Sequence, residues 1–362
     1  MKLIWLALFV FYAPFVAAAN LRVALIVPDQ ETQRFWQQVV DFAQAVAEDH
    51  NIHLDIHYSD TNRFAFRTTI ENILQQANKP DYLIFRPMQG TAVEAFSQLD
   101  SLNIGFVTLE QGLSDAELDE VGLPQQKYPN WLGAVVYDDA DGGAQLTAAL
   151  HKRHLQLQPD SSMYMTAIAG GFERLSLIRQ SSLNQLPLRR GPIVLNQIFP
   201  MSWSVSTVQQ NFPAIYDRYP DTDAYWCVSD AFALTISAWL NTHQAKTNPL
   251  IGGFDWLPEA ISAIEQGKIT ASVGGHFLMA GKALLKIIAY QQGDKQTAPS
   301  LLLEKYELID QDNVADYQAF LQQAPWAAID YRQFSRASQA TPPELSISNM
   351  IKAFAQTSTA PQ

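Results

Sequence analysis

The chain has 362 residues, 48% of them hydrophobic and 17% charged, with one cysteine and a formal net charge of −12. It is too apolar to be disordered and too long for one small core, so we expect two globular lobes. Because acidic residues outnumber basic ones, a nucleic acid or an anionic membrane is disfavoured as a partner, and one cysteine forms no internal disulfide.

The N-terminus has the features of a secretory signal peptide. Lys2 precedes an apolar run over residues 3–11, and the segment ends in the small residues Ala17–Ala19. A membrane anchor is the alternative, but about 20 apolar residues are needed to span a bilayer, and Pro14 fits cleavage better. We therefore expect residues 1–19 to be removed on export. An exported chain without an N-terminal cysteine for lipid attachment fits the periplasm of a bacterium with two membranes.

Short apolar runs follow at regular intervals and predict ten strands. The first five are Leu21–Val27, Ile52–Tyr58, Tyr82–Arg86, Ile104–Leu109 and Gly133–Tyr137. The second five are Met163–Ile168, Ile193–Phe199, Ala224–Val228, Leu250–Phe254 and Ile269–Val273. Most are continuously apolar, as strands of a parallel sheet covered on both faces must be.

Amphipathic stretches between these runs predict helices. The first begins at about Phe35, and others are expected at about 64–77, 89–101, 141–153, 172–185, 205–218, 230–241, 257–266 and 277–292. Strand–helix alternation builds doubly wound α/β sheets, and ten strands fit two such lobes better than one. A short helix is expected over 316–324, and the tail from about Thr341 is expected to be poorly ordered.

Polar or aromatic residues follow almost every predicted strand, at the sheet edge where ligands bind in open α/β folds. Residues 29–36 follow the first predicted strand. The third, fourth and fifth predicted strands lead into Arg86-Pro87, Glu110-Gln111 and Asp138-Asp139. Ser229-Asp230 and Asp255-Trp256 do the same in the second series. Asp138 and Asp230 also suit helix N-caps, which favour aspartate.

The sequence contains no motif of a known catalytic or cofactor site. It has no Gly-x-Gly-x-x-Gly, no phosphate loop and no Gly-x-Ser-x-Gly elbow. His53, Asp55 and His57 would share one strand face and so could bind a metal, but polar alternation on a half-exposed edge strand is the commoner explanation. We expect no cofactor, no metal and no enzymatic activity.

Five sequence pieces stand in an order and spacing typical of one family. They are Val27-Pro28 with Phe35-Trp36, Asp81–Pro87, Val228–Leu234, Gly252–Asp255 and Ala260–Val273. Over about residues 21–308 the chain resembles the type I periplasmic binding proteins, especially the ribose-type sugar-binding branch and the autoinducer-2-binding receptor. The resemblance implies two doubly wound lobes that close on a small polar molecule around a three-stranded hinge. It places residues 20–137 and about 277–302 in one lobe, and 138–276 with about 303–340 in the other.

The resemblance also implies a set of ligand-binding positions, which combine aromatic rings with carboxylates and other polar groups. The positions are Asp29, Gln33, Phe35, Trp36, Glu110, Gln111, Asp138, Arg179, Trp203, Ser229, Asp255 and His276. Carboxylates accept hydroxyl protons, arginine donates in a fork, and flat rings cover the apolar face of a sugar. Gln111, Ser229 and His276 depart from the ribose type, so ribose itself is disfavoured. Phe35 and Trp36 also suit core positions of a helix, and His276 a helix N-terminus.

The expected function is capture of a small hydroxylated ligand, a sugar or sugar-like signal, and its presentation to an inner-membrane ABC permease. A sensor kinase or cyclase is the alternative partner, and the stretch from Gln311 to Arg336 is either a docking element or a brace. An exported glycosidase using Glu110 and Asp255 is a remote alternative. A transcriptional regulator of the same fold conflicts with the signal peptide.

Overall fold

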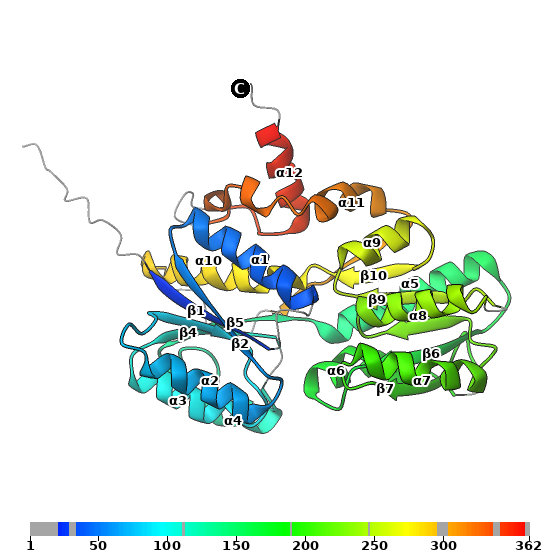
Figure 1. Cartoon of the computed structure of the whole chain (residues 1–362), viewed down its shortest axis with the longest axis horizontal. Coiled ribbons are helices and arrows are strands. Elements are labelled where there is room, and N and C mark those ends of the chain that lie inside the picture. Colours follow the sequence, from blue (N-terminus) through cyan, green and yellow to red (C-terminus); the bar gives the residue numbers. More distant parts are fainter. Residues whose placement is uncertain are drawn as a thin grey trace, which may run out of the picture.

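The computed structural model describes residues 21–28, 34–110, 113–188, 190–244, 247–294, 303–335 and 341–358. These residues form two lobes, each built on a six-stranded sheet (Figure 1). The N-terminal lobe has the strand order β11 (Leu303–Glu304), β5 (Trp131–Tyr137), β4 (Gly105–Leu109), β3 (Tyr82–Phe85), β1 (Arg22–Pro28) and β2 (His53–Ser59). The C-terminal lobe has the order β12 (Glu307–Asp310), β10 (Ala271–Gly274), β9 (Leu250–Phe254), β8 (Ala224–Cys227), β6 (Met163–Ala169) and β7 (Ile193–Pro200). All pairings are parallel except that of β10 with β12.

Helices cover both sheets. The N-terminal lobe carries α1 (Arg34–Asp49), α2 (Arg63–Gln75), α3 (Ala92–Ser101), α4 (Asp115–Val121) and α10 (Met279–Gln291). The C-terminal lobe carries α5 (Asp139–Leu157), α6 (Arg174–Arg179), α7 (Val205–Arg218), α8 (Asp230–Thr242) and α9 (Pro258–Glu265). Four short 3₁₀ turns are η1 (Ser181–Gln185), η2 (His276–Leu278), η3 (Trp326–Ala328) and η4 (Tyr331–Phe334). The two-lobed α/β fold predicted from the sequence is confirmed.

Strand β1 shows why the apolar runs are continuous. Val23, Leu25 and Val27 pack into one core with α1 and α10, whereas Ala24 and Ile26 pack into a second core with α2 and α3. Side chains alternate between the two faces of a strand, so a strand buried on both faces needs an apolar residue at every position.

The chain passes between the lobes three times. The crossings lie between β5 and α5, between β10 and α10, and between β11 and β12. Two hinge tyrosines, Tyr137 and Tyr306, pack with ring centroids 5.1 Å apart. These connections form a multi-strand hinge at one end of the interface between the lobes.

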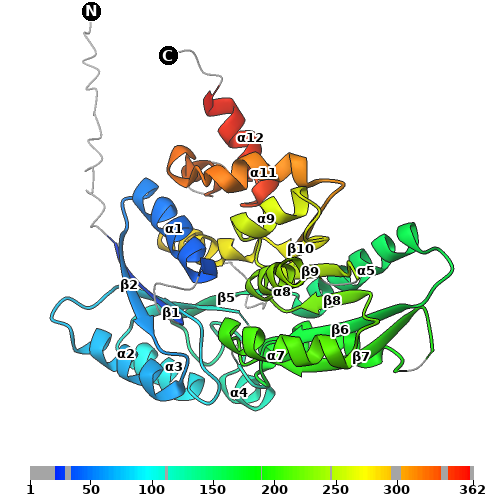
Figure 2. The same cartoon turned by 45° about the vertical axis from the view of Figure 1, so that its right-hand side comes forward.

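A C-terminal segment that includes α11 (Val314–Gln323) and α12 (Ile347–Ser358) spans both lobes. Figure 2 shows it lying over α1 and α9. Helix α11 packs on α9 of the C-terminal lobe, and η3 and η4 pack on α1 of the N-terminal lobe. Trp326 is buried against Phe42, Phe277 and Phe320. The stretch therefore contacts both lobes, as a stabilising element would, and a docking role remains the alternative.

The structure differs from the sequence-based expectations for residues 303–304 and 347–358. Residues 347–358 form α12 instead of a poorly ordered tail, because Ile347, Met350 and Ala353 bury one apolar face. Residues 303–304 pair with β5 and so extend the N-terminal sheet, although they were expected in the C-terminal lobe. Every predicted strand occurs within two residues of its expected bounds. The expected signal peptide lies outside the described residues, and within those residues no helix is both long and apolar enough to cross a bilayer.

Candidate functional site

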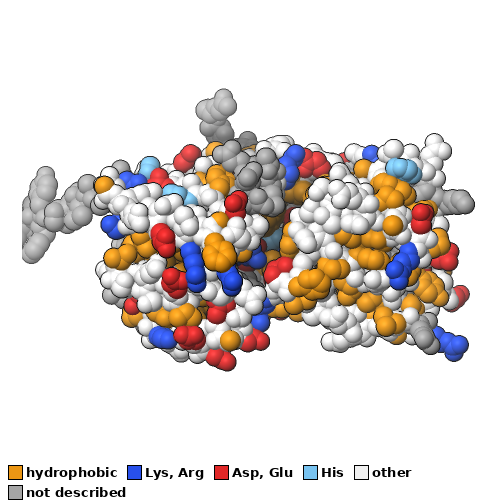
Figure 3. Space-filling model, turned by 60° about the horizontal axis from the view of Figure 1, so that its bottom comes forward, with side chains coloured by type: hydrophobic (Ala, Val, Ile, Leu, Met, Phe, Trp, Pro, Cys, Tyr) orange, Lys and Arg blue, Asp and Glu red, His pale blue; other side chains and the backbone are white. Residues whose placement is uncertain are grey.

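A cleft of about 870 Å³ lies between the lobes, at the carboxyl ends of the strands of both sheets. Figure 3 shows the furrow between the two lobes, with acidic and basic side chains near it. The N-terminal lobe contributes Phe35 and Trp36 from α1, Arg86 after β3, and Glu110 after β4. Because doubly wound sheets bind ligands at this edge, the cleft is the candidate ligand site.

Most of the site residues predicted from the sequence converge on this cleft. Its lining includes Phe35, Trp36, Glu110, Arg179, Trp203, Ser229, Asp255 and His276. Asp138 does not line it; its carboxylate caps α5 by accepting the Asp141 backbone N–H at 3.1 Å. Asp29, Gln33 and Gln111 lie outside the described residues.

Asp255 and His276 form the floor of the cleft. His276 Nε2 lies 3.4 Å from Asp255 Oδ1, and the imidazole stacks on the Phe35 ring at 4.5 Å. Burial raises the pKa of Asp255 to about 7, although Arg179 acts to lower it. Burial, reinforced by Arg179, holds the pKa of His276 well below its usual range. At neutral pH the imidazole is therefore uncharged, and Asp255 titrates.

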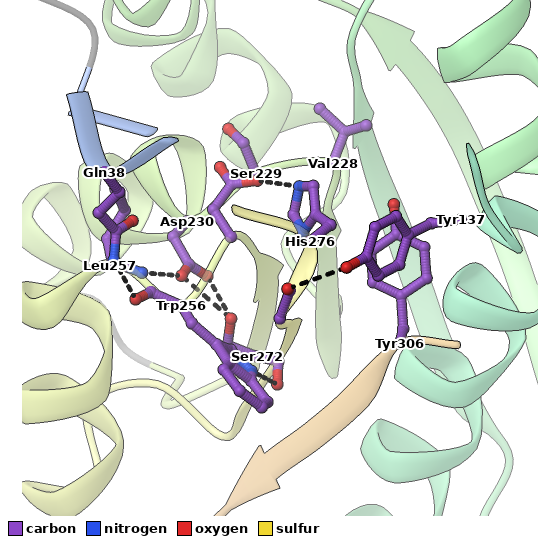
Figure 4. Close-up of polar contacts among 12 residues, drawn as sticks. Gln38, Tyr137, Val228, Ser229, Asp230, Trp256, Leu257, Ser272, His276 and Tyr306 are labelled. Atoms are coloured by element: carbon purple, nitrogen blue, oxygen red, sulfur yellow. Dashed lines mark hydrogen bonds and ion pairs between the residues drawn. The ribbon is translucent and has the colours of Figure 1, made fainter. Parts of the chain in front are cut away.

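The backbone at Asp255 is strained. Its φ is 114° and that of Trp256 is 60°, both in the left-handed region that costs non-glycine residues about 1–3 kcal/mol. Asp230 supports this turn from behind, because its carboxylate accepts the Leu257 N–H at 3.0 Å and the Ser272 hydroxyl at 2.8 Å (Figure 4). Strain of this kind persists only where the surroundings hold it, and here it directs Asp255 into the cleft.

The residue that caps α8 is Ser229. Its hydroxyl accepts the Phe232 N–H at 3.4 Å, so the N-cap role considered for Asp230 was wrong. Figure 4 shows Ser229 on one side of His276 and the rings of Tyr137 and Tyr306 on the other. Ser229 thus combines a structural role with a place in the cleft lining.

Arg179 is buried in a network that uses most of its donors. Its guanidinium donates to Asp139 at 3.0 Å, to the Val228 carbonyl at 3.1 Å and to the Tyr306 hydroxyl at 2.9 Å. It also lies 4.5 Å from the centroid of the Phe254 ring. Burial acts to lower the pKa of Arg179, but Tyr306 and Asp139 together raise it by more than burial lowers it. The guanidinium therefore stays charged.

Arg86 and Glu110 face each other in the N-terminal half of the cleft. Arg86 Nε lies 2.7 Å from Glu110 Oε2, and the two side chains are 17% and 8% exposed. No hydrogen bond of good geometry satisfies either atom within the described residues. Burial raises the pKa of Glu110, an effect that Arg86 opposes.

Trp203 forms a wall in the C-terminal half. Its indole N–H donates to Glu173 at 2.6 Å, and its φ of 54° turns the chain sharply after β7. The ring lies against the backbone of Gly170, where a Cβ would come within 2.4 Å of the indole. Glycine at position 170 therefore makes room for this aromatic surface.

Among the residues that the structure describes, two ion pairs join the lobes across the cleft. Arg34 of α1 pairs with Glu259 of α9, and Arg174 of α6 pairs with Asp115 of α4 at 2.6 Å. Gln38 also donates to the Trp256 carbonyl at 3.3 Å. The structure thus shows the lobes in direct contact around the cavity.

Several residues that line the cleft were not among the predicted ligand-binding positions: Arg34, Arg86, Met88, Glu173 and Arg174. Their position in the sequence could have indicated them, because Arg86 and Met88 follow the end of β3, and Glu173 and Arg174 follow the end of β6. The His53–Asp55 pair lies on the edge strand β2, where Asp55 also pairs with Arg22 at 2.8 Å. Among the described residues, no cluster of three or more His, Cys, Asp or Glu side chains is arranged to hold a metal ion.

Comparison with known proteins places this geometry in context. A family model described as a periplasmic binding protein domain matches residues 23–296. A periplasmic sugar-binding protein from Pseudomonas fluorescens has a TM-score of 0.76 at 22% identity, covering 90% of this chain and 96% of that one. A solute-binding protein from Actinobacillus succinogenes with bound D-allose has a TM-score of 0.70 at 17% identity, covering 82% and 100%. No curated protein sequence matches the chain.

Proposed function

Since the chain belongs to the periplasmic binding protein family, we propose that it captures a small, neutral, hydroxylated ligand between its lobes. The ligand would be a sugar or a sugar-like signal. The members of this family bind solutes and do not transform them, so we propose binding without catalysis. Export through the N-terminal segment would place this binding in the periplasm.

One observation carries the proposal of a neutral ligand: within the described residues, each arginine that lines the cleft has a carboxylate partner. The pairs are Arg34–Glu259, Arg86–Glu110, Arg174–Asp115 and Arg179–Asp139. A sugar acid or phosphate needs a basic group with unbalanced charge. A neutral polyol instead needs donors and acceptors in balance, which paired arginines and carboxylates supply.

Aromatic surfaces support a sugar ring in particular. Phe35 and Trp36 lie on the N-terminal side of the cleft and Trp203 on the C-terminal side. Flat rings cover the apolar faces of sugars, while buried carboxylates such as Glu110 and Asp255 accept hydrogen bonds from their hydroxyls. Relatives of the same fold were solved with D-allose, L-arabinofuranose and myo-inositol, all hydroxylated rings.

For the partner we propose an inner-membrane ABC permease that reads the closed form. A ligand that contacts both lobes favours closure by its differential affinity for that state. Two relatives of the same fold are described as components of ABC transporters. A deletion strain that loses uptake of the radiolabelled ligand would support transport. Normal uptake with a changed transcriptional response would support the alternative, a sensor kinase or cyclase.

The ligand proposal is tested by titrating the purified protein with D-allose, L-arabinose, D-galactose, D-glucose, D-ribose, myo-inositol and autoinducer-2. The last compound tests the finer resemblance to the autoinducer-2-binding receptor. Binding is expected to raise the melting temperature and to change tryptophan emission, since Trp36 and Trp203 line the cleft. Calorimetry gives the affinity. Binding of sugar acids or sugar phosphates with no response to neutral compounds would overturn the proposal.

A further inference from the structure

Arg179 occupies the position at which the family resemblance implies a ligand-reading arginine, yet its guanidinium is committed elsewhere. Its three nitrogens donate to Asp139, the Val228 carbonyl and the Tyr306 hydroxyl, and its side chain is only 2% exposed. A donor already bonded to buried protein acceptors gains little from a ligand, because it must give up one hydrogen bond to make another. Arg179 therefore holds the hinge side of the cleft together.

Arg86 has the opposite character. Its Nε faces Glu110, and the structure gives its terminal nitrogens no hydrogen-bond partner within the described residues. The side chain is 17% exposed, toward the cleft that it lines. A guanidinium has five donors in a fixed fork. Within the part of the chain that the structure describes, Arg86 thus presents unused donors next to the buried acceptor oxygens of Glu110.

We propose that Arg86, instead of Arg179, is the specificity-determining arginine of the cleft, and that with Glu110 it selects ligands carrying two adjacent hydroxyls. The inference rests on the proposed function, because it concerns how the same site reads a neutral sugar. One hydroxyl accepts from Arg86, its neighbour donates to Glu110, and the pair keeps its zero net charge when the ligand enters. Bonds to charged groups discriminate strongly, since an analogue that lacks the hydroxyl leaves a buried group unpaired.

The experiment uses calorimetry on the full mature chain. The probe is the tightest binder among D-allose, L-arabinose, D-galactose, D-glucose, D-ribose and myo-inositol, together with its monodeoxy analogues. The variant Arg86→Gln is compared with Arg67→Gln, which removes an arginine from the surface pair Arg67–Glu94 of the same lobe. Because Arg86→Gln leaves Glu110 without its partner, the double variant Arg86→Gln/Glu110→Gln provides a neutral pair of similar shape.

Arg86→Gln is expected to weaken binding of the parent sugar about 10- to 100-fold, whereas Arg67→Gln leaves it unchanged. For the deoxy analogue that lacks the hydroxyl bound by Arg86, Arg86→Gln should weaken binding by less than about threefold. Glu110→Gln should show the same pattern for the analogue lacking the adjacent hydroxyl. Equal affinities of wild type, Arg86→Gln and the folded double variant would overturn the assignment. Failure of the wild type to bind any neutral compound would overturn the proposed function itself.

Discussion

Asp255 Oδ1 lies 3.4 Å from His276 Nε2, and the two buried side chains meet on the floor of the cleft between the lobes. Their titrations are displaced in opposite directions, because burial disfavours the charged form of each. The pKa of Asp255 is raised to about 7, whereas that of His276 is lowered well below its usual range. Near neutral pH, the group that titrates on the floor of the cleft is therefore the Asp255 carboxyl and not the His276 imidazole.

Ligand affinity is expected to rise with pH between 6 and 8. We expect the ionised form of Asp255 to accept hydrogen bonds from two ligand hydroxyls, and the groups around it are Arg179, Asp230 and His276. With a pKa of about 7, a site that needs the ionised form binds about tenfold more tightly at pH 8 than at pH 6. Calorimetry across this range checks the slope. In Asp255→Asn it should vanish, and a slope that survives there would belong to another buried carboxyl with a raised pKa, Glu110 or Asp230.

Asp255→Asn is also expected to stabilise the ligand-free protein above neutral pH. The folded-state pKa of about 7 exceeds the unfolded value of about 3.9, so the folded chain binds more protons between these values. Ionisation of Asp255 therefore lowers the free energy of unfolding as pH rises from about 4 to about 7, by at most about 4 kcal/mol. Guanidinium unfolding should show the variant to be more stable at pH 8, with the difference gone near pH 4. Equal or lower stability at pH 8 would contradict this.

Much of the fold was predictable because burial on both faces leaves a readable pattern. The strand Leu250–Phe254 was predicted with its observed bounds. Strand β11 has two residues, and its pairing with β5 depends on the hinge, so no periodicity marks it. Helix α4 was missed because it is short and acidic, although Ser114 and Glu117 form a capping box that could have indicated it.

The sequence predicted many of the residues that line the cleft but not what each of them does there. The rule that ligands bind after strand ends located Glu110 and Asp255. The division of labour between Arg86 and Arg179 depends on which carboxylate each guanidinium meets. Arg179 meets Asp139 and Tyr306, which come from other elements, and only the packed hinge brings these groups together. The sequence alone therefore does not indicate which of the two arginines is held by buried partners and which faces the ligand.

Trp203→Leu is expected to weaken sugar binding about tenfold or more, through loss of the ring that covers the ligand. The indole is held by Glu173 at 2.6 Å, so Glu173→Gln should have a smaller effect in the same direction. Trp239 is the control, because it packs outside the cleft against Phe212 and Tyr216. Trp239→Leu should lower stability without changing affinity. Similar affinity losses for both tryptophan variants would argue against a ligand-facing role of Trp203.

Trp326→Ala is expected to reduce the free energy of unfolding by about 3–5 kcal/mol. Trp326 is 6% exposed and contacts aromatic rings from α1, η2 and α11, so its loss leaves a cavity where the C-terminal segment packs on α1 and η2. Urea unfolding measures the change, and Trp326→Phe should cost less. A cost below 1 kcal/mol would mean that the segment contributes little to holding the lobes.

Asp115→Asn and Glu259→Gln are expected to shift the ligand-free protein toward an open form. Their partners, Arg174 and Arg34, belong to the opposite lobe, so these ion pairs require closure. Exposed pairs contribute up to about 1 kcal/mol each, which corresponds to about a fivefold change in a closing equilibrium. The double variant should show a larger radius of gyration in small-angle scattering and a weaker apparent affinity, with the difference from wild type shrinking at high salt. Glu94→Gln breaks a pair within one lobe and is the control. If the double variant showed the same scattering and the same affinity as this control, the ion pairs would form on closure without stabilising the closed form.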